Sequence, residues 1–255
     1  MHRVIAIFEN TFKEGLRQRI LSLLGIFALL LIVVSVFLEP FALGEAPKIM
    51  RDFGLAVTSL FGVLTTIIIG SALIHRDIEK RTIYTVLAKP VRRGEVVLGK
   101  FLGLGALIAL LVLAMLLIHQ LIIFVQEGVF EPSLLIVFPF ELIEVSVILG
   151  ILLLFSSFSS STLTSIMGVI FFVTGHAMPD LKLFAESTKV EALKHVAYGF
   201  YYLLPNLSNF NFRTDLAYNI PLPADQVIFS VCYGVIYTVF LLYVTTLIFE
   251  RREFK

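Results

Sequence analysis

Long apolar runs dominate the hydrophobic pattern of this chain. A membrane-spanning helix needs about 20 mostly apolar residues. Four runs reach that length without an Asp, Glu, Lys or Arg: residues 20–38, 53–74, 101–126 and 226–249. Each of the four runs therefore predicts one transmembrane helix.

A fifth apolar run, residues 133–178, is too long for one span and long enough for two. Its only charged residues are Glu141 and Glu144. Serine and threonine gather at residues 155–165, "FSSFSSSTLTS", so we expect the break between the two spans there. The pattern predicts an all-α integral membrane fold of six transmembrane helices, organised as one domain over residues 1–255.

Two segments outside the spans have the pattern of amphipathic helices. In residues 2–19, apolar side chains recur at near-helical spacing and polar ones fall mostly on the other side, which predicts a helix lying in the membrane interface. Residues 181–204 mix apolar and charged side chains and end before Pro205. We expect this second segment to be a helix resting on the outer surface.

Composition and charge agree with this arrangement. The chain is 58% hydrophobic and only 15% charged, against about 25% charged in soluble domains. If the N-terminus is cytoplasmic, 14 of the 20 lysines and arginines fall in cytoplasmic flanks, as the positive-inside rule requires. Both termini are then cytoplasmic and residues 179–225 form a long outer segment. The single cysteine, Cys232, excludes an intrachain disulfide.

The stretch "GEVVLGKF", residues 94–101, matches most of the phosphate-binding loop G-x-x-x-x-G-K-[ST]. The last position is Phe101, which has no hydroxyl for a magnesium ion. A long apolar run follows it, whereas the loop needs a buried strand before it and a helix of a soluble domain after it. The sequence therefore does not predict an ATP site here.

The segment from His75 to Gly103 contains the only sizeable cytoplasmic loop, which is rich in charge at its start and apolar later. A helix in this loop would end before Pro90, since proline disfavours helix in the preceding residue. Such a helix could dock in a groove of a soluble partner and transmit force to the spans. The alternative is a solvated connector held near anionic lipid by its basic residues.

This segment resembles the coupling region of permeases of type-2 ABC exporters, in particular the branch that includes permeases for copper-enzyme maturation. The matching positions are Asp77, Glu79, Thr82, Val86, Leu87, Ala88, Pro90, Val91, Arg93, Val97, Leu98, Gly99 and Lys100. Arg81 departs from the pattern, because the family usually has glycine there. The resemblance extends to "ENTFKEGLRQRI", to the serine-rich stretch and to "YYLLPNLSNFNF" at 201–212.

The resemblance implies a division of labour between subunits. The chain would be a permease rather than an enzyme, forming the substrate path as a dimer with a second copy or a similar chain. A separate ABC ATPase subunit would bind ATP and magnesium, and this chain would hold no cofactor or metal itself. The expected surroundings are the lipids of the prokaryotic cytoplasmic (inner) membrane, with no nucleic-acid partner.

The resemblance also assigns roles to individual segments. Residues 1–19 would be the elbow helix and residues 76–90 the coupling helix. The coupling surface would consist of Asp77, Glu79, Arg81, Thr82, Tyr84 and Leu87. Gly94 would permit the turn after the coupling helix, and Lys100 would reach the headgroups. Gly99 and Gly103 would allow close helix packing.

Three ionisable residues inside the spans are candidates for the substrate path. Glu141 and Glu144 are three residues apart and share a helix face; they either line a polar outer cavity and touch substrate, or lie wet near headgroups after Pro139. His119 is either a ligand or a hydrogen-bonded packing residue. His176 ends the fifth span and is expected at the interface.

Two other functions use the same features. An intramembrane metalloprotease needs carboxylates and histidines, but its H-E-x-x-H spacing is absent from the sequence. A membrane scaffold without transport needs only the spans. The apolar spans do not identify a substrate among the ions, drugs, lipids and glycans that the family exports.

Overall fold

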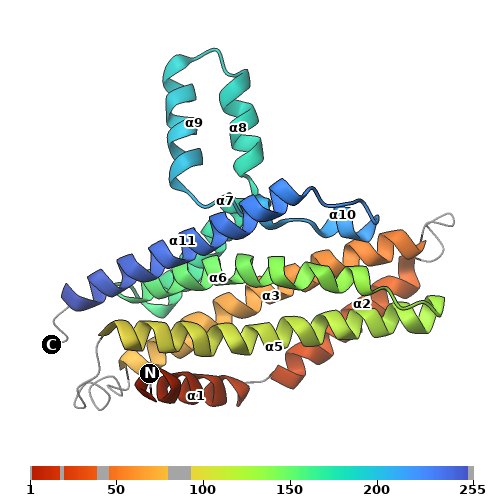
Figure 1. Ribbon diagram of the computed structural model, residues 1–255, viewed down its shortest axis with the longest axis horizontal. Coiled ribbons are helices and arrows are strands. Elements are labelled where there is room, and N and C mark those ends of the chain that lie inside the picture. The colour runs from red at the N-terminus through yellow and green to blue at the C-terminus, as the bar shows by residue number, and fades with distance from the viewer. Residues whose placement is uncertain (1, 18–19, 39–45, 80–92, 252–255) are drawn as a thin grey trace.

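The structure is a computed structural model that describes residues 2–17, 20–38, 46–79 and 93–251, and its regular elements there are helices (Figure 1). The long helices are α2 (Ile20–Leu38), α3 (Ala46–Glu79), α5 (Arg93–Glu127), α6 (Val137–Ser156), α7 (Ser161–His176) and α11 (Ala224–Arg251). The short ones are α1 (His2–Leu16), η2 (Pro132–Ile136), α8 (Met178–Ser187), α9 (Glu191–Leu203), η3 (Leu207–Phe210) and α10 (Arg213–Ala217).

Four helical segments in the described residues are long and apolar enough to cross a membrane: Lys48–Leu73, Arg93–Glu127, Pro132–Ser156 and Ala224–Glu250. Helices α7 and α8 together make a fifth candidate, bent by 53°. The prediction of an all-helical, multi-pass membrane protein is confirmed. Residues 20–38 are helical as predicted and form α2, but α2 is not among the helices that meet the criterion for a span. Six spans therefore stays a prediction.

Helices α3, α5 and α6 form the centre of the bundle, with α11 lying along α6 (Figure 1). Val63 of α3, Ile108 of α5 and Ile148 of α6 are fully buried in one shared core. Leu241 of α11 packs directly over Gly150 of α6. Helix α2 packs on α3 and α5 through a second, smaller apolar cluster. The central helices are thus held mainly by aliphatic packing.

The outward faces of α2 and α11 are strongly apolar. Their exposed side chains include Ile26, Leu29, Ile32, Phe37, Ile228, Ile236, Val239 and Phe240. Soluble monomers rarely expose contiguous apolar surface on this scale. These faces are therefore suited to contact with lipid.

Helix α1 packs closely against the start of α5. A Cβ on Gly99 would lie 2.8 Å from Ile7 Cβ, and one on Gly103 would lie 2.9 Å from the Phe8 carbonyl oxygen and 2.8 Å from Thr11 Cβ. Only glycine leaves room for α1 at these two positions. The predicted close packing at Gly99 and Gly103 is confirmed, and the structure identifies α1 as the partner.

Two expectations for the start of α5 are corrected. The helix begins at Arg93, so Gly94 lies in its first turn, where a Cβ would be 3.3 Å from Thr246 Cγ2, instead of in a turn before it. Lys100 is only 8% exposed, so it is buried rather than open to headgroups. The reason is that α1 covers this face of α5.

The break between α6 and α7 lies within the serine-rich stretch, as predicted. Ser156 and Ser157 donate hydrogen bonds back to the carbonyls of Leu153 and Leu154 at the end of α6. Ser160 then caps α7 by accepting from the Leu163 amide at 3.4 Å. Hydroxyl groups that satisfy free backbone groups at helix ends favour a break here.

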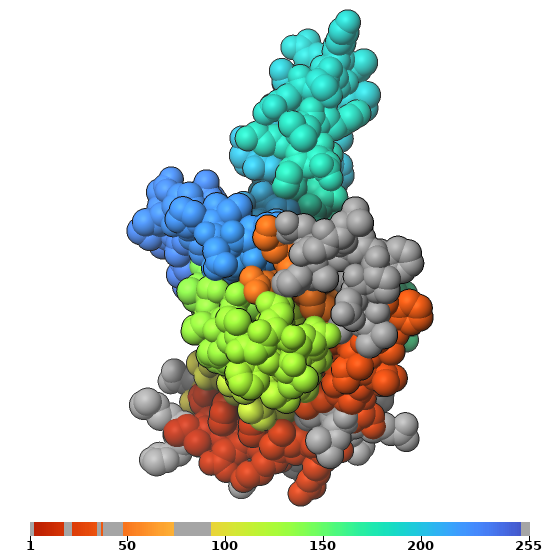
Figure 2. All heavy atoms as spheres, turned by 90° about the vertical axis from the view of Figure 1, so that its right-hand side faces the viewer, coloured from red at the N-terminus to blue at the C-terminus, as the bar shows by residue number. Residues whose placement is uncertain are grey.

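The segment after α7 differs from the prediction of one helix over 181–204. Two helices, α8 and α9, pack side by side as a hairpin and stand out from the bundle on the side opposite α1 (Figures 1 and 2). The chain is extended at Thr188 and Val190, and the Thr188 hydroxyl accepts from the Val190 amide. This local turn breaks the helix, whereas its end before Pro205 is as predicted.

Candidate functional site

Four charged or titratable side chains from three helices meet in the bundle. Glu141 and Glu144 lie on one face of α6, His176 is the last residue of α7, and Arg213 is the first residue of α10. We refer to these four residues as the Arg213 cluster. The two glutamates are 2% and 1% exposed, so the cluster is built inside the protein.

Arg213 lies between the two carboxylates. Its Nε atom is 3.3 Å from Glu141 Oε1, and its Nη2 atom is 3.3 Å from Glu144 Oε2. On the other side of Glu144, Oε1 is 3.6 Å from His176 Nε2. Arg213 Nη2 is also 3.5 Å from His176 Nε2. A buried guanidinium that reaches two carboxylates is a strong point of attachment.

The expectation that Glu141 and Glu144 could be wet is wrong. Pro139 does lie in the first turn of α6, but the chain around α10 covers this part of the helix. Phe212 packs on Phe140 with ring centroids 4.5 Å apart, and both rings are buried. This contact brings the following residue, Arg213, over the carboxylates. Whether either glutamate touches substrate stays a prediction.

The segment that carries Arg213 is held at several points besides the cluster. Thr214 donates from its hydroxyl to Asp52 Oδ1 of α3 at 3.2 Å. Ser208 donates to the carbonyl oxygen of His176 at 2.9 Å, and Ser230 of α11 donates to that of Asn209 at 2.6 Å. The position of Arg213 is therefore fixed by contacts to α3, α7 and α11.

His119 lies elsewhere, between α5 and α3. It is 1% exposed, and its Nε2 atom is 3.3 Å from the Met50 carbonyl oxygen. Its ring packs directly on Gly54, where a Cβ could not fit. The structure thus shows a hydrogen-bonded packing contact for His119 and does not place it among the four residues of the Arg213 cluster.

Arg213 itself was not singled out from the sequence. It follows directly after "YYLLPNLSNFNF", the stretch that carries part of the family resemblance. It is also the only arginine in the predicted outer segment 179–225. These two facts together were the available signal, because two carboxylates in an apolar span need a cationic partner.

A second arginine joins three other elements at the same end of the bundle. Arg51 of α3 reaches Glu127 of α5 at 2.6 Å and Glu131, just before η2, at 2.8 Å. All three side chains are largely buried, at 14–17% exposed. This end of the structure is therefore held by two arginine-centred ion-pair groups.

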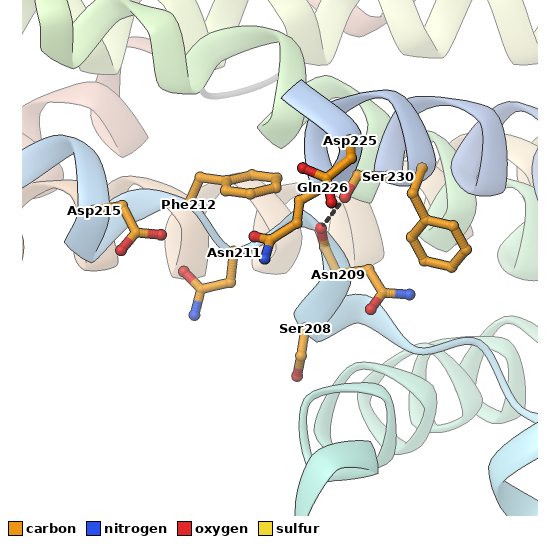
Figure 3. Close-up of a pocket in the computed structure, with 9 residues that line it drawn as sticks. Ser208, Asn209, Asn211, Phe212, Asp215, Asp225, Gln226 and Ser230 are labelled. Carbon is orange, nitrogen blue, oxygen red and sulfur yellow. Dashed lines mark hydrogen bonds between the residues drawn. The ribbon is translucent and has the colours of Figure 1, made fainter. Parts of the chain in front are cut away.

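A pocket of about 490 Å³ lies beside the Arg213 cluster (Figure 3). It is lined by Ser208, Asn209, Asn211, Phe212, Asp215, Asp225, Gln226, Phe229 and Ser230. Phe212 and Asp215 flank Arg213 in sequence, so the pocket and the cluster share one chain segment. The lining is mostly polar, with two carboxylates and no basic group, which is better suited to a neutral or cationic ligand than to an anion.

The predicted coupling surface lies mostly outside the described residues. Asp77 and Glu79 are in the last turn of α3, and Arg81, Thr82, Tyr84 and Leu87 fall in residues 80–92, which the structure does not describe. Arg93, the first residue of α5, donates to the carbonyls of Phe249 and Glu250 in α11. The start of α5 therefore lies next to the end of α11. The end of α3 is found at this same end of the bundle, where α1 also packs (Figure 1).

Metal-binding chemistry is not indicated in the part of the chain that the structure describes. Those residues contain no group of three or more His, Cys, Asp or Glu side chains placed to hold a metal ion.

Comparison with known proteins places these features in a family context. Residues 5–254 match the model of the ABC-2 family transporter proteins. The chain is also similar to the probable ABC transporter permease protein NosY of Stutzerimonas stutzeri, with 29% identity over 118 residues. That match spans 44% of this chain and 42% of the relative.

Proposed function

Because this chain belongs to the ABC-2 transporter family, we propose that it is the membrane-spanning permease subunit of an ATP-driven exporter. The observation that carries the proposal is the extent of the family match, residues 5–254, which takes in every described long helix. The partial similarity to a NosY permease supports the same function. Export as the direction of transport follows the family resemblance.

The proposed exporter subunit has six spans: α2, α3, α5, α6, the bent pair α7–α8, and α11. Helix α1 is its elbow helix, and its packing on Gly99 and Gly103 ties it to α5. Both termini face the cytoplasm of a prokaryotic cell, in keeping with the distribution of lysine and arginine. The Arg51 and Arg213 groups then lie toward the outer side of the inner membrane.

ATP hydrolysis is proposed to take place in a separate ABC ATPase subunit, which binds ATP and magnesium. Residues 76–90 are the coupling helix that docks on it. The packing of α1 and α11 on α5 at one end supports this, because a movement of the connection between α3 and α5 would reach both helices through their contacts with α5.

The complete transporter is proposed to contain two permease chains and two ATPases. A bundle of this size needs a second copy, or a similar chain, to enclose a path. The exposed apolar faces of α2 and α11 provide surface for that partner and for lipid.

In the proposed exporter the Arg213 cluster holds the outer segment around α10 against α6. Glu141 and Glu144 lie at the outer part of the path, and opening the path requires Arg213 to leave them or to move with them. His119 remains a candidate for the path only if α3 and α5 separate, since its ring is now closed in between them.

Site-specific photo-crosslinking in the native host tests the proposed function. A crosslinker placed at Thr82, Tyr84 or Leu87 is expected to capture a soluble ABC ATPase. The same crosslinker at Asn209, in the polar pocket, is the control and should capture none. Capture from Asn209 but not from the three loop positions would contradict both the coupling surface and the orientation.

A further inference from the structure

The charges in the Arg213 cluster do not balance when each group has its ordinary form. Two ionised glutamates contribute two negative charges and Arg213 contributes one positive charge. Burying an uncompensated charge is costly, and proteins avoid it by pairing or neutralising the group. The two glutamates are at most 2% exposed, so water does not compensate the remaining charge.

The hydrogen bonding of His176 shows where the imbalance lies. Its Nδ1 atom is 3.2 Å from the Phe172 carbonyl oxygen, which can only accept. Nδ1 therefore carries hydrogen, and in a neutral ring Nε2 is a bare acceptor. This Nε2 faces Glu144 Oε1 at 3.6 Å.

Among the described residues, none donates a hydrogen bond to Glu144 Oε1. The bare Nε2 atom can accept from Arg213 Nη2 at 3.5 Å, but an ionised Glu144 Oε1 would face this nitrogen as a second acceptor with no donor of its own. One proton between them removes the repulsion, turns the contact into a donor–acceptor pair and cancels the excess charge. The charge count and the facing acceptors are separate observations that call for the same single proton.

We infer that Glu144 and His176 together form a binding site for one proton, held in the closed arrangement of the Arg213 cluster. The proton resides on Glu144 Oε1 or on His176 Nε2, and in either case the four residues sum to zero charge. A larger cation does not fit the role, because the carboxylates are enclosed and Arg213 already occupies the space between them.

The other charged side chains named here, all on described elements around the cluster, are paired elsewhere, line the pocket or are exposed. Arg51 of α3 is committed to Glu127 and Glu131. Asp52 of α3 accepts from Thr214, and Asp215 of α10 lines the pocket. The charged residues of α8 are Asp180, Lys182 and Glu186, and the charged residue at the start of α11 is Asp225. All four are exposed, and the three acids among them would add to the negative charge.

Loss of the proton leaves one unpaired negative charge in the cluster and weakens the attachment of α7 and α10 to α6. The strength with which the cluster holds the segment carrying Arg213 against α6 therefore depends on protonation. The inference rests on the proposed function only for the consequence that this segment closes the outer end of an export path.

The test measures protonation directly on the purified chain in lipid nanodiscs, without ATPase or transport. Infrared spectroscopy with isotope-labelled glutamate detects a protonated carboxylic acid, and nitrogen NMR with labelled histidine detects an imidazolium. At neutral pH we expect one of two signals: an acid band lost in Glu144→Gln, or an imidazolium resonance lost in His176→Asn. Glu9→Gln, which changes an exposed glutamate of α1, is the matched control and should lose neither.

An ionised Glu144 beside a neutral His176 in the folded wild type would overturn the inference. A second readout covers variants that fold poorly. The thermal stability of the wild type should fall as the pH rises toward the value at which the folded cluster loses its proton, because the unfolded chain loses that proton at lower pH. The stability of Glu144→Gln should not show this fall. A wild-type stability with the same pH dependence as Glu144→Gln would also count against the site. The measurement uses the purified chain without an ATPase partner. If the proton is detected but a separate assay finds no transport, only the proposed function is rejected.

Discussion

At the residue scale, the burial of Glu141 and Glu144 depends on Arg213. On insertion scales a charged side chain at the centre of a membrane helix costs roughly 2.5–3.5 kcal/mol, and α6 carries two glutamates in its N-terminal half. Arg213 reaches both carboxylates at 3.3 Å from a segment far away in sequence. The stability of α6 within the bundle therefore depends on a residue outside the spans.

Arg213→Gln should be strongly destabilising. It leaves Glu141 and Glu144 buried without a cation, and removal of one partner of a buried pair typically costs about 3–5 kcal/mol. The measurement is thermal or denaturant unfolding in detergent, with the triple variant Arg213→Gln, Glu141→Gln, Glu144→Gln as control. The triple variant should recover much of the loss, and a single variant as stable as the wild type would contradict the described ion pairs.

The site could be predicted only in part from the sequence. Glu141 and Glu144 stand out because they are the only charges in a long apolar run. Nothing local shows that His176 and Arg213 join them, because these contacts depend on how α7 and α10 return to α6. The choice between wet and buried carboxylates likewise depends on Phe212 packing over Phe140, a tertiary contact without a sequence pattern.

At the scale of elements, hydropathy predicted where the long helices lie but not all of their ends. Residues 53–74 and 101–126 are the apolar parts of α3 and α5, and both helices continue through charged residues into Glu79 and Arg93. The length of an apolar run shows which part of a helix is suited to lipid. The backbone hydrogen bonds of the helix do not depend on apolar side chains and continue beyond that run. The hairpin α8–α9 was read as one helix because its turn at Thr188 contains neither glycine nor proline.

The packing of α1 on α5 gives a test with a built-in control. Gly103→Ala places a methyl group 2.9 Å from the Phe8 carbonyl oxygen, so α1 must shift away. Overpacking of this kind costs typically about 1–3 kcal/mol. Gly105→Ala, in the same helix with open space around it, should be neutral or gain up to about 1 kcal/mol from helix propensity.

The readout is the thermal stability of both variants, with protease cleavage within α1 as a local probe. Gly103→Ala should expose α1 to cleavage earlier than Gly105→Ala. Equal behaviour of the two variants would mean that α1 does not lie against Gly103.

At the scale of the whole molecule, the two ends of the bundle gather different elements. One end gathers α1, the start of α5 and the end of α11 next to the connection between α3 and α5. The other end carries the two arginine groups and the polar pocket. A signal from an ATPase would have to travel from the first end to the second along α3, α5 and α6, which share one packed core.

Leu87→Asp tests the first end. A charge on the apolar side of the proposed coupling helix should uncouple ATP hydrolysis from transport, while the membrane spans stay inserted. The measurement is ATPase activity and transport of the reconstituted complex, with Leu87→Met as the conservative control. Normal coupling in Leu87→Asp would count against docking through this segment.

The most direct test of the central claim is mass spectrometry of the tagged chain, purified gently in detergent from its native host. We expect a soluble ABC ATPase at one per permease chain, in a complex with two copies of each. A chain that purifies alone as an active monomer, with no ATPase even after crosslinking at residues 79–87, would contradict the account of this protein as a permease driven by a separate ATPase.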